Sequence, residues 1–253
     1  MFDVKVMVAA AACAAGVMVA GAAPAATLVD FGNPWGAIGS VRAAMDEAFG
    51  AGAWQEETSP GDVGFLANES FVYVEGSDST TNDMESFLGA QAGAILDWIR
   101  AGGSLFINAA PNTGDGLSFG GLSLVYDRTN YCNAGCVADD PSNPIFDGIE
   151  AAEFTGSSFS HGIVTGGTSI IRDADGNSLL AEAIYGEGRI LMGTMTTTNF
   201  HGFGEGQELR ANILSYAADG ASAPSPVPLP ASALLLVGGL GGLAALRRRA
   251  AKA

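Results

Sequence analysis

The side chains that could carry chemistry in this sequence are few. It holds three cysteines and two histidines in 253 residues. Cys132 and Cys136 stand close together in YCNAGCVADD, whereas Cys13 falls within an apolar leader. Two thiols supply only half of a structural zinc site, and no second cysteine or histidine pair has a suitable spacing. In an exported chain, which meets an oxidising compartment, the pair predicts a small disulfide loop.

The two histidines, His161 in SSFSHG and His201 in NFHG, are the candidates for a base or a metal ligand. A pairing with nearby carboxylates would build a metal site, but two separate histidines are weak evidence for one. DADGN, at 173–177, partly matches a calcium loop, but its glycine is at the fourth position and no glutamate follows at the twelfth. A hairpin turn explains it better. We therefore predict no metal and no cofactor.

A polar loop, EGSDSTTND, follows an apolar run and offers the best candidate for a binding crevice. Ligands of open parallel sheets commonly bind where the strands end, which favours Asp78, Asn82 and Asp83. We group Asp78 and Asn82 with His201 as the predicted crevice. Capping of the following helix is the other explanation for Asn82.

The chain between residues 27 and 220 alternates predicted strands with predicted helices. Two strand, helix, strand crossings favour a parallel sheet covered on both faces. The second half is richer in strands. The predicted strands are 27–31, 71–75, 104–109, 168–173, 177–186 and 188–195, and the predicted helices are 40–50, 82–102 and 207–218.

This order, together with AGGSLFINAAP, NPIFDGI and YGEGRILMG, resembles the class I glutamine-amidotransferase-like domains, including trehalose-utilisation-type relatives. The resemblance covers most of 28–218. It implies the α/β class: a single flavodoxin-like or amidotransferase-like domain over 27–220, with a mostly parallel sheet and a strand-rich second half.

The resembled enzymes place a cysteine on a tight turn after a central strand, where a histidine oriented by a carboxylate activates it. Here Ala109, Ala110 and Pro111 follow the strand, so the nucleophile is absent. NFHG resembles the histidine motif and places His201 there, but Gly202 and Phe203 replace the expected proline and glutamate. We predict a non-catalytic binding or structural domain. The alternative is a divergent hydrolase that uses His201 with an acidic partner.

Residues 1–26 have the layout of a secretory signal peptide, with one lysine near the start, an apolar run and small residues at the end. Cleavage by signal peptidase is expected after Ala25 or Ala26. A retained membrane helix is the alternative, but the segment is short and rich in alanine.

The other end combines a proline-rich linker over 221–230, an apolar stretch over 231–246 and three arginines, Arg247, Arg248 and Arg249. Sixteen helical residues cover about 24 Å, which is marginal for a bilayer core of about 30 Å. Clustered arginines stay on the cytoplasmic side, so the body is expected outside. The sequence thus predicts a transmembrane helix within 231–253.

The order of motif, apolar stretch and arginines resembles the VPLPA variety of PEP-CTERM sorting signals, with Val227, Pro228, Leu229, Pro230 and Ala231 as the motif. The resemblance implies transient retention at the inner membrane, with the body in the periplasm. An exosortase-type protease would then cut at the motif and deliver the body to the cell surface or the exterior. It also suggests an association with extracellular polymer. A permanently anchored periplasmic domain is the alternative.

The charge balance excludes one class of partner. The chain has 27 Asp and Glu against 11 Lys and Arg, for a formal net charge of −16, and no lysine lies between residues 27 and 220. Such a surface repels nucleic acid and anionic lipid. We therefore expect no nucleic-acid partner.

Overall fold

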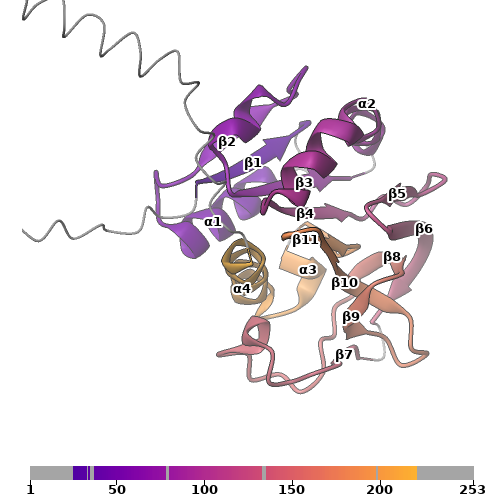
Figure 1. The fold of residues 1–253 in the computed structure, drawn as a ribbon. Coiled ribbons are helices and arrows are strands. Elements are labelled where there is room, and N and C mark those ends of the chain that lie inside the picture. The colour runs from indigo at the N-terminus through magenta and orange to yellow at the C-terminus, as the bar shows by residue number, and fades with distance from the viewer. Residues whose placement is uncertain are drawn as a thin grey trace, which may run out of the picture.

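The computed structural model describes residues 25–220, except 33, 35–36, 78–79, 133–134 and 198, and leaves out the side chains of 128–131 and 199. One sheet of eleven strands is packed with helices on both faces (Figure 1). The strands are β1 (Ala26–Asp30), β2 (Gln55–Thr58), β3 (Phe71–Gly76), β4 (Ser104–Ala109), β5 (Leu117–Phe119), β6 (Leu122–Tyr131), β7 (Val137–Ala138), β8 (Ser160–Thr165), β9 (Thr168–Arg172), β10 (Ser178–Tyr185) and β11 (Gly188–Gly193). The α-helices are α1 (Ile38–Phe49), α2 (Thr81–Arg100), the short α3 (Asn199–Gly202) and α4 (Gly206–Asp219), and the 3₁₀ helices are η2 (Gly64–Asn68) and η3 (Pro144–Phe146).

The strand order corrects the fold predicted from the sequence. It runs β2-β1-β3-β4-β11-β10-β8-β6-β5, with β9 joined to β10 and β7 joined to β9. Within the described residues, four strand pairs are parallel, namely β1 with β2 and β3, and β4 with β3 and β11. The other six pairs are antiparallel. The expected flavodoxin-like domain with a mostly parallel sheet is therefore wrong.

The connections explain this change of strand direction. Parallel neighbours need a long crossover, whereas antiparallel neighbours can be joined by a tight turn. β5 and β6 are joined at Gly120 and Gly121, and β8 and β9 at Gly166 and Gly167, all four with positive φ. The predicted turn at 173–177 is confirmed, because Asp173 accepts the Asn177 N–H at 2.7 Å between paired β9 and β10. The α-helices that connect strands, α1 and α2, lie between β1 and β2 and between β3 and β4.

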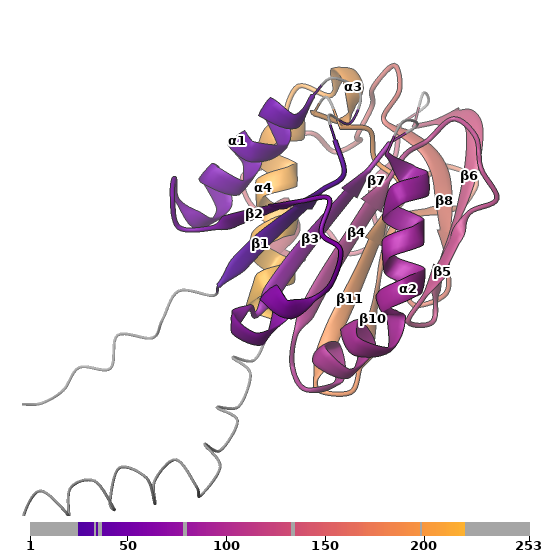
Figure 2. The same cartoon turned by 90° about the horizontal axis from the view of Figure 1, so that it is seen from above.

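Two apolar cores lie on opposite faces of the sheet. Helix α2 covers one face, and α1 and α4 cover the other (Figure 2). Side chains alternate along the strands: Val72 and Val74 of β3 pack in the α2 core, whereas Phe71 and Tyr73 pack in the α1/α4 core. The same alternation applies to the polar residues at the strand ends, because each residue faces the opposite core from its neighbour in the strand.

The helix starts differ from the expected caps. Helix α2 begins at Thr81 with Thr80 at the N-cap position, so Asn82 is an exposed second helical residue and does not cap. The Thr80 hydroxyl instead accepts the Ser77 N–H at 2.9 Å, which fixes the loop before the helix.

The free edges of the sheet are short or charged. β2 carries Glu56 and Glu57, and Arg42 of α1 pairs with Glu56 at 2.7 Å. At the other extreme β5 has three residues, and β7 has two. Both devices discourage further strand addition at an edge.

Cys132 and Cys136 form the expected disulfide, with their Cα atoms 4.9 Å apart. Both residues are buried beside Phe154, whose strand-like bridge to Cys136 joins the loop to the α1/α4 core. The bond thus holds the end of β6 against the segment that precedes β8.

The predicted sorting signal and transmembrane helix, residues 227–253, lie outside the described residues, as does the signal peptide before Ala25. Among the residues that are described, no helix combines the length and apolar character needed to cross a membrane.

We expect replacement of both Cys132 and Cys136 by alanine to lower the free energy of unfolding by about 2 kcal/mol, since the bond closes a short loop in the unfolded chain. In a domain of this size the melting temperature should fall by about 4 to 8 °C. Calorimetry of the wild-type protein and the double variant tests this. As a control, dithiothreitol should not lower the melting temperature of the variant further. Equal melting temperatures for the two proteins would contradict the prediction.

Candidate functional site

The parallel strands end in a row of polar residues on the α1/α4 face. In register, Asp30 of β1 lies beside Glu75 of β3, Glu75 beside Asn108 of β4, and Asn108 beside Gly193 of β11. Carboxyl ends of adjacent parallel strands are the usual location of ligand sites in such sheets. The point between β1 and β3, where the chain passes from one side of β1 to the other, lies within this row.

The centre of the row is a hydrogen-bonded network. The Asn108 amide donates to both Glu75 oxygens, at 3.0 and 3.1 Å, and to the Met195 carbonyl at 2.8 Å. The Met195 N–H donates back to Asn108 at 3.1 Å, and the Tyr73 hydroxyl donates to Glu75. A Cβ on Gly193 would lie 2.9 Å from the Asn108 oxygen. Glycine is therefore required for this amide to bridge β3, β4 and the chain after β11.

Among the described residues, Arg210 of α4 supplies the one cation that affects the pKa of Glu75. It is 1% exposed, its Nη2 donates to the Thr196 carbonyl at 3.1 Å, and its guanidinium lies 5.1 Å from the centre of the Phe200 ring. Its Nε and Nη1 have no hydrogen-bond partner within the described part of the chain. Burial raises the pKa of Glu75 to about 7, although the Arg210 charge and the hydrogen bonds from Tyr73 and Asn108 lower it.

This network is sealed from solvent. Glu75 is 0% exposed and Asn108 1% exposed, and Asp30, at the end of the row, is 5% exposed. Burial also raises the pKa of Asp30, whose carboxylate accepts the Gly32 N–H at 2.9 Å. Such a network can fix the strand ends. Because its members are almost completely buried, a substrate cannot reach it without a movement of the residues that cover it.

The turn after β4 carries no nucleophile. Ala109 and Ala110 are fully buried, and Pro111 follows them. The next residue, Asn112, contacts Nδ1 of His161 through its side-chain oxygen at 2.7 Å. His161 is thereby part of the packing of this loop against β8. The described residues contain no group of three or more side chains suited to hold a metal ion.

His201 lies in the tight turn α3, where it and Phe200 both have positive φ. Its Nδ1 is 2.9 Å from the Ser157 hydroxyl, which is also 3.3 Å from the His201 carbonyl oxygen. Both side chains are exposed. The carboxylate of Glu205 does not orient the histidine; it accepts the Glu150 N–H at 2.8 Å instead. Both contacts are explained if the Nδ1–H of His201 donates to the Ser157 hydroxyl and this hydroxyl donates to the His201 carbonyl.

The predicted crevice of Asp78, Asn82 and His201 is only partly visible. Asp78 lies outside the described residues. Asn82 is exposed on α2, and no hydrogen bond joins it to His201 within the described chain.

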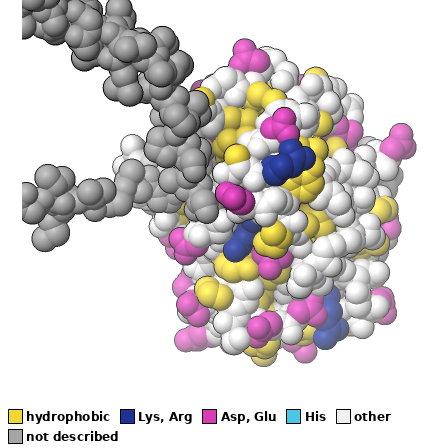
Figure 3. Space-filling model, viewed as in Figure 1, with side chains coloured by type: hydrophobic (Ala, Val, Ile, Leu, Met, Phe, Trp, Pro, Cys, Tyr) yellow, Lys and Arg dark blue, Asp and Glu magenta, His cyan; other side chains and the backbone are white. Residues whose placement is uncertain are grey.

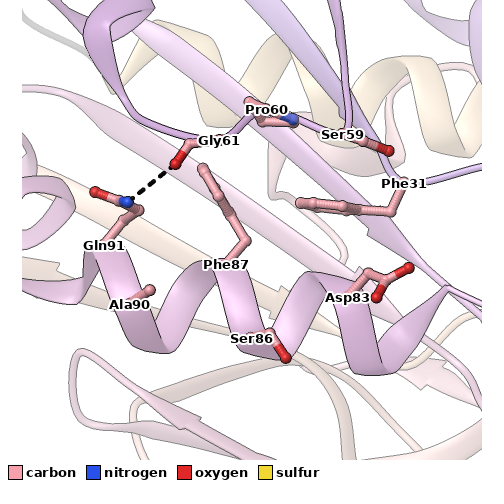
Figure 4. A pocket seen from close by; sticks show the side chains of 9 residues that line it. All are labelled: Phe31, Ser59, Pro60, Gly61, Asp83, Ser86, Phe87, Ala90 and Gln91. Carbon is pink, nitrogen blue, oxygen red and sulfur yellow. Dashed lines mark hydrogen bonds between the residues drawn. The ribbon is translucent and has the colours of Figure 1, made fainter.

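An open pocket of about 340 Å³ lies beside this edge, on the α2 face (Figure 4). Phe31, just after β1, and Phe87 of α2 form its apolar wall, with ring centres 5.5 Å apart. Gln91 of α2 holds the loop opposite by donating to the Gly61 carbonyl at 3.4 Å. The lining residues are Phe31, Ser59, Pro60, Gly61, Asp83, Ser86, Phe87, Ala90 and Gln91.

Sequence reasoning misses both features for identifiable reasons. Glu75 ends an apolar strand, and the pattern assigns it only to that strand, although a carboxylate at a buried strand end is a signal in itself. Arg210 sits among the apolar positions of α4, where a charge signals a buried partner. Of the pocket, the sequence signals Asp83 alone, because the site joins residues from the end of β1, the loop after β2 and α2.

No protein-family model matches this chain, and no curated protein matches it. A cytoplasmic protein from Salmonella typhimurium is similar in structure at 12% identity, over 77% of this chain and 98% of that one, with a TM-score of 0.47. An exo-β-1,4-mannosidase from Opitutaceae bacterium strain TAV5 has 13% identity over 78% of this chain and a TM-score of 0.45. A β-galactosidase from Bacillus circulans sp. alkalophilus has 10% identity over 79% of this chain and a TM-score of 0.46. This chain spans only 36% and 32% of the two glycosidases. Likenesses this remote assign neither activity nor ligand.

We expect Glu75→Gln to change how stability depends on pH. Because the pKa of Glu75 is about 7 in the folded protein and 4.5 in an unstructured chain, the folded protein binds a proton between these values that the unfolded chain does not. Glu75 thus contributes stability that is fully present below about pH 4.5 and is lost as the pH rises through 7. The loss is on the order of 3 kcal/mol.

The variant lacks this loss, so it should match the wild type at pH 4.5 and exceed it in stability at pH 8. Urea unfolding at both pH values measures the difference, and Glu187→Gln, at an exposed position, is the control. The same difference between variant and wild type at both pH values would show that Glu75 does not titrate in this range.

Proposed function

We propose that this chain is an exported, non-catalytic binding domain, delivered through the VPLPA sorting motif at 227–231 to the cell surface or the exterior. The observation that carries the non-catalytic part is the turn after β4. There the resembled amidotransferase-like enzymes have their nucleophile, and this chain has buried Ala109 and Ala110 followed by Pro111. The charged groups at the neighbouring strand ends are sealed in their own network, whereas the pocket beside them is open.

The export part of the proposal rests on the two terminal segments. A signal peptide over 1–26, the linker over 221–230 and the arginines at 247–249 form one consistent sorting path through the inner membrane, with signal peptidase and an exosortase-type protease as processing partners. The buried disulfide between Cys132 and Cys136 is in keeping with an oxidising exterior. Extracellular polymer is the proposed class of binding target at the destination.

One observation favours a second function, that of a divergent hydrolase. Ser157 and His201 are exposed and 2.9 Å apart, which is the distance of a nucleophile and its base. Glu205, the nearest acidic residue in the sequence of this loop, is bonded to the backbone at Glu150. The pair thus lacks the third group that would orient the imidazole.

We expect Ser157→Ala and His201→Ala to leave hydrolysis of glutamine and of p-nitrophenyl esters at the background rate of the wild-type protein, because the pair serves the loop. Initial rates of ammonia and p-nitrophenol release measure this, and circular dichroism checks folding. Wild-type turnover that falls more than tenfold in both folded variants would replace the binding domain with the hydrolase.

We expect the mature protein to begin near Thr27 and to end near the VPLPA motif. Intact-mass analysis of protein from the medium and from membranes, with peptide mapping of both ends, checks this. Cells that lack the sorting protease provide the control and should retain Arg247, Arg248 and Arg249. The same intact tail in wild-type cells would show a permanently anchored periplasmic domain.

A further inference from the structure

The pocket beside β1 and α2 contains a carboxylate without a countercharge. Asp83, in the first turn of α2, lines the pocket and has no hydrogen-bond or ion-pair partner within the described residues. None of the nine lining residues is Lys, Arg or His. Figure 4 shows the Asp83 carboxylate and the rings of Phe31 and Phe87 on the side of α2 that faces the loop of Ser59, Pro60 and Gly61. The pocket therefore attracts a positive charge and repels an anion.

The apolar wall limits the shape of what can bind. Phe31 and Phe87 are only 9% and 8% exposed, and their rings are tilted by 52° to each other. They leave no broad aromatic face on which a sugar ring could stack, but they suit a narrow aliphatic chain. Ala90 also lines the pocket and takes up little of its volume, because its side chain is only a methyl group.

Among the nine side chains that line the pocket, Asp83 carries the only charge. The Gln91 NH2 group donates to the Gly61 carbonyl, and Ser86 points away from the loop in Figure 4. A single carboxylate is a poor site for a divalent cation, which prefers six or more oxygen ligands. It suits an ammonium group, which presents three donors. Figure 3 shows Asp and Glu side chains spread over the visible face with few cations among them, so the field of the domain also favours a cationic ligand.

We propose that this pocket binds an organic cation, a primary ammonium group on a short aliphatic chain, with the ammonium on Asp83 and the chain against the wall formed by Phe31 and Phe87. The cavity of about 340 Å³ holds such a ligand with room for water at the mouth. The inference rests on the proposed binding function, and it names the class of ligand.

Titration of the full chain with n-pentylammonium chloride, followed by the amide chemical shifts of Phe31, Gly61 and Phe87, tests the proposal. We expect saturable binding in about the millimolar range, as is usual for so small a ligand. n-Pentanol, of the same length without the charge, should bind at least about tenfold more weakly. Glucose should not shift these amides. Equal binding of amine and alcohol, binding of glucose in place of amine, or no saturation would each overturn the proposal.

Two variants and one control separate binding from folding. Asp83→Asn should weaken amine binding at least about tenfold and leave the affinity for n-pentanol unchanged, an outcome that a purely helix-stabilising Asp83 would not give. Ala90→Leu should block the amine by filling the cavity, while leucine is well tolerated in a helix. Glu187→Gln removes one charge at an exposed site outside the pocket and should bind as the wild type does. Wild-type affinity in Asp83→Asn would overturn the assignment.

The hydrolysis assay on the same preparation keeps the two proposals distinguishable. Amine binding that fails in an inactive protein overturns only the ligand class. Turnover that depends on Ser157 and His201 overturns the binding function, whichever ligand the pocket takes.

Discussion

The fold depends on the insertion of β11 beside β4. β11 joins the two halves of the sheet, because it pairs in parallel with β4 on one side and antiparallel with β10 on the other. The antiparallel half is attached to the rest of the sheet through β11 and its partner β10. The sheet is therefore continuous only when residues 188–193 have paired with residues 104–109. Asn108 holds this junction, since its amide and carbonyl oxygen bind the chain at Met195 in both directions.

The sequence was informative where local patterns decide structure. The apolar spacing of 84–99 predicted α2, and the cysteine spacing predicted the disulfide, because both depend on residues near one another in the chain. The sheet type was not predictable in the same way. Strand direction depends on the length of the connections, and the apolar runs of β10 and β11 read alike in either direction. The resemblance to a parallel fold then led to the incorrect prediction of a mostly parallel sheet.

The candidate site has a closed part, the network of Glu75 and Asn108, and an open part, the pocket beside Phe31. One physical reason accounts for both. Side chains of alternate parity at the strand ends enter different layers. Asp30, Glu75 and Asn108 enter the layer covered by α1 and α4, where Asn108 donates to Glu75 and Asp30 accepts the Gly32 N–H. Phe31, one residue further on, enters the layer of α2, where a pocket remains between α2 and the loop after β2. A prediction of this division needs both the register and the helix positions, which no single motif contains.

The charged strand β2 bears on the proposed delivery of this domain to a cell surface. A layer of identical domains at high local concentration brings sheet edges repeatedly into contact, and an open, neutral edge would let strands of neighbouring copies pair. Glu57 on every copy of this edge repels the same residue on the next, and the other edges are two or three residues long. Dense layers of this domain should therefore remain collections of separate molecules and not grow into fibres.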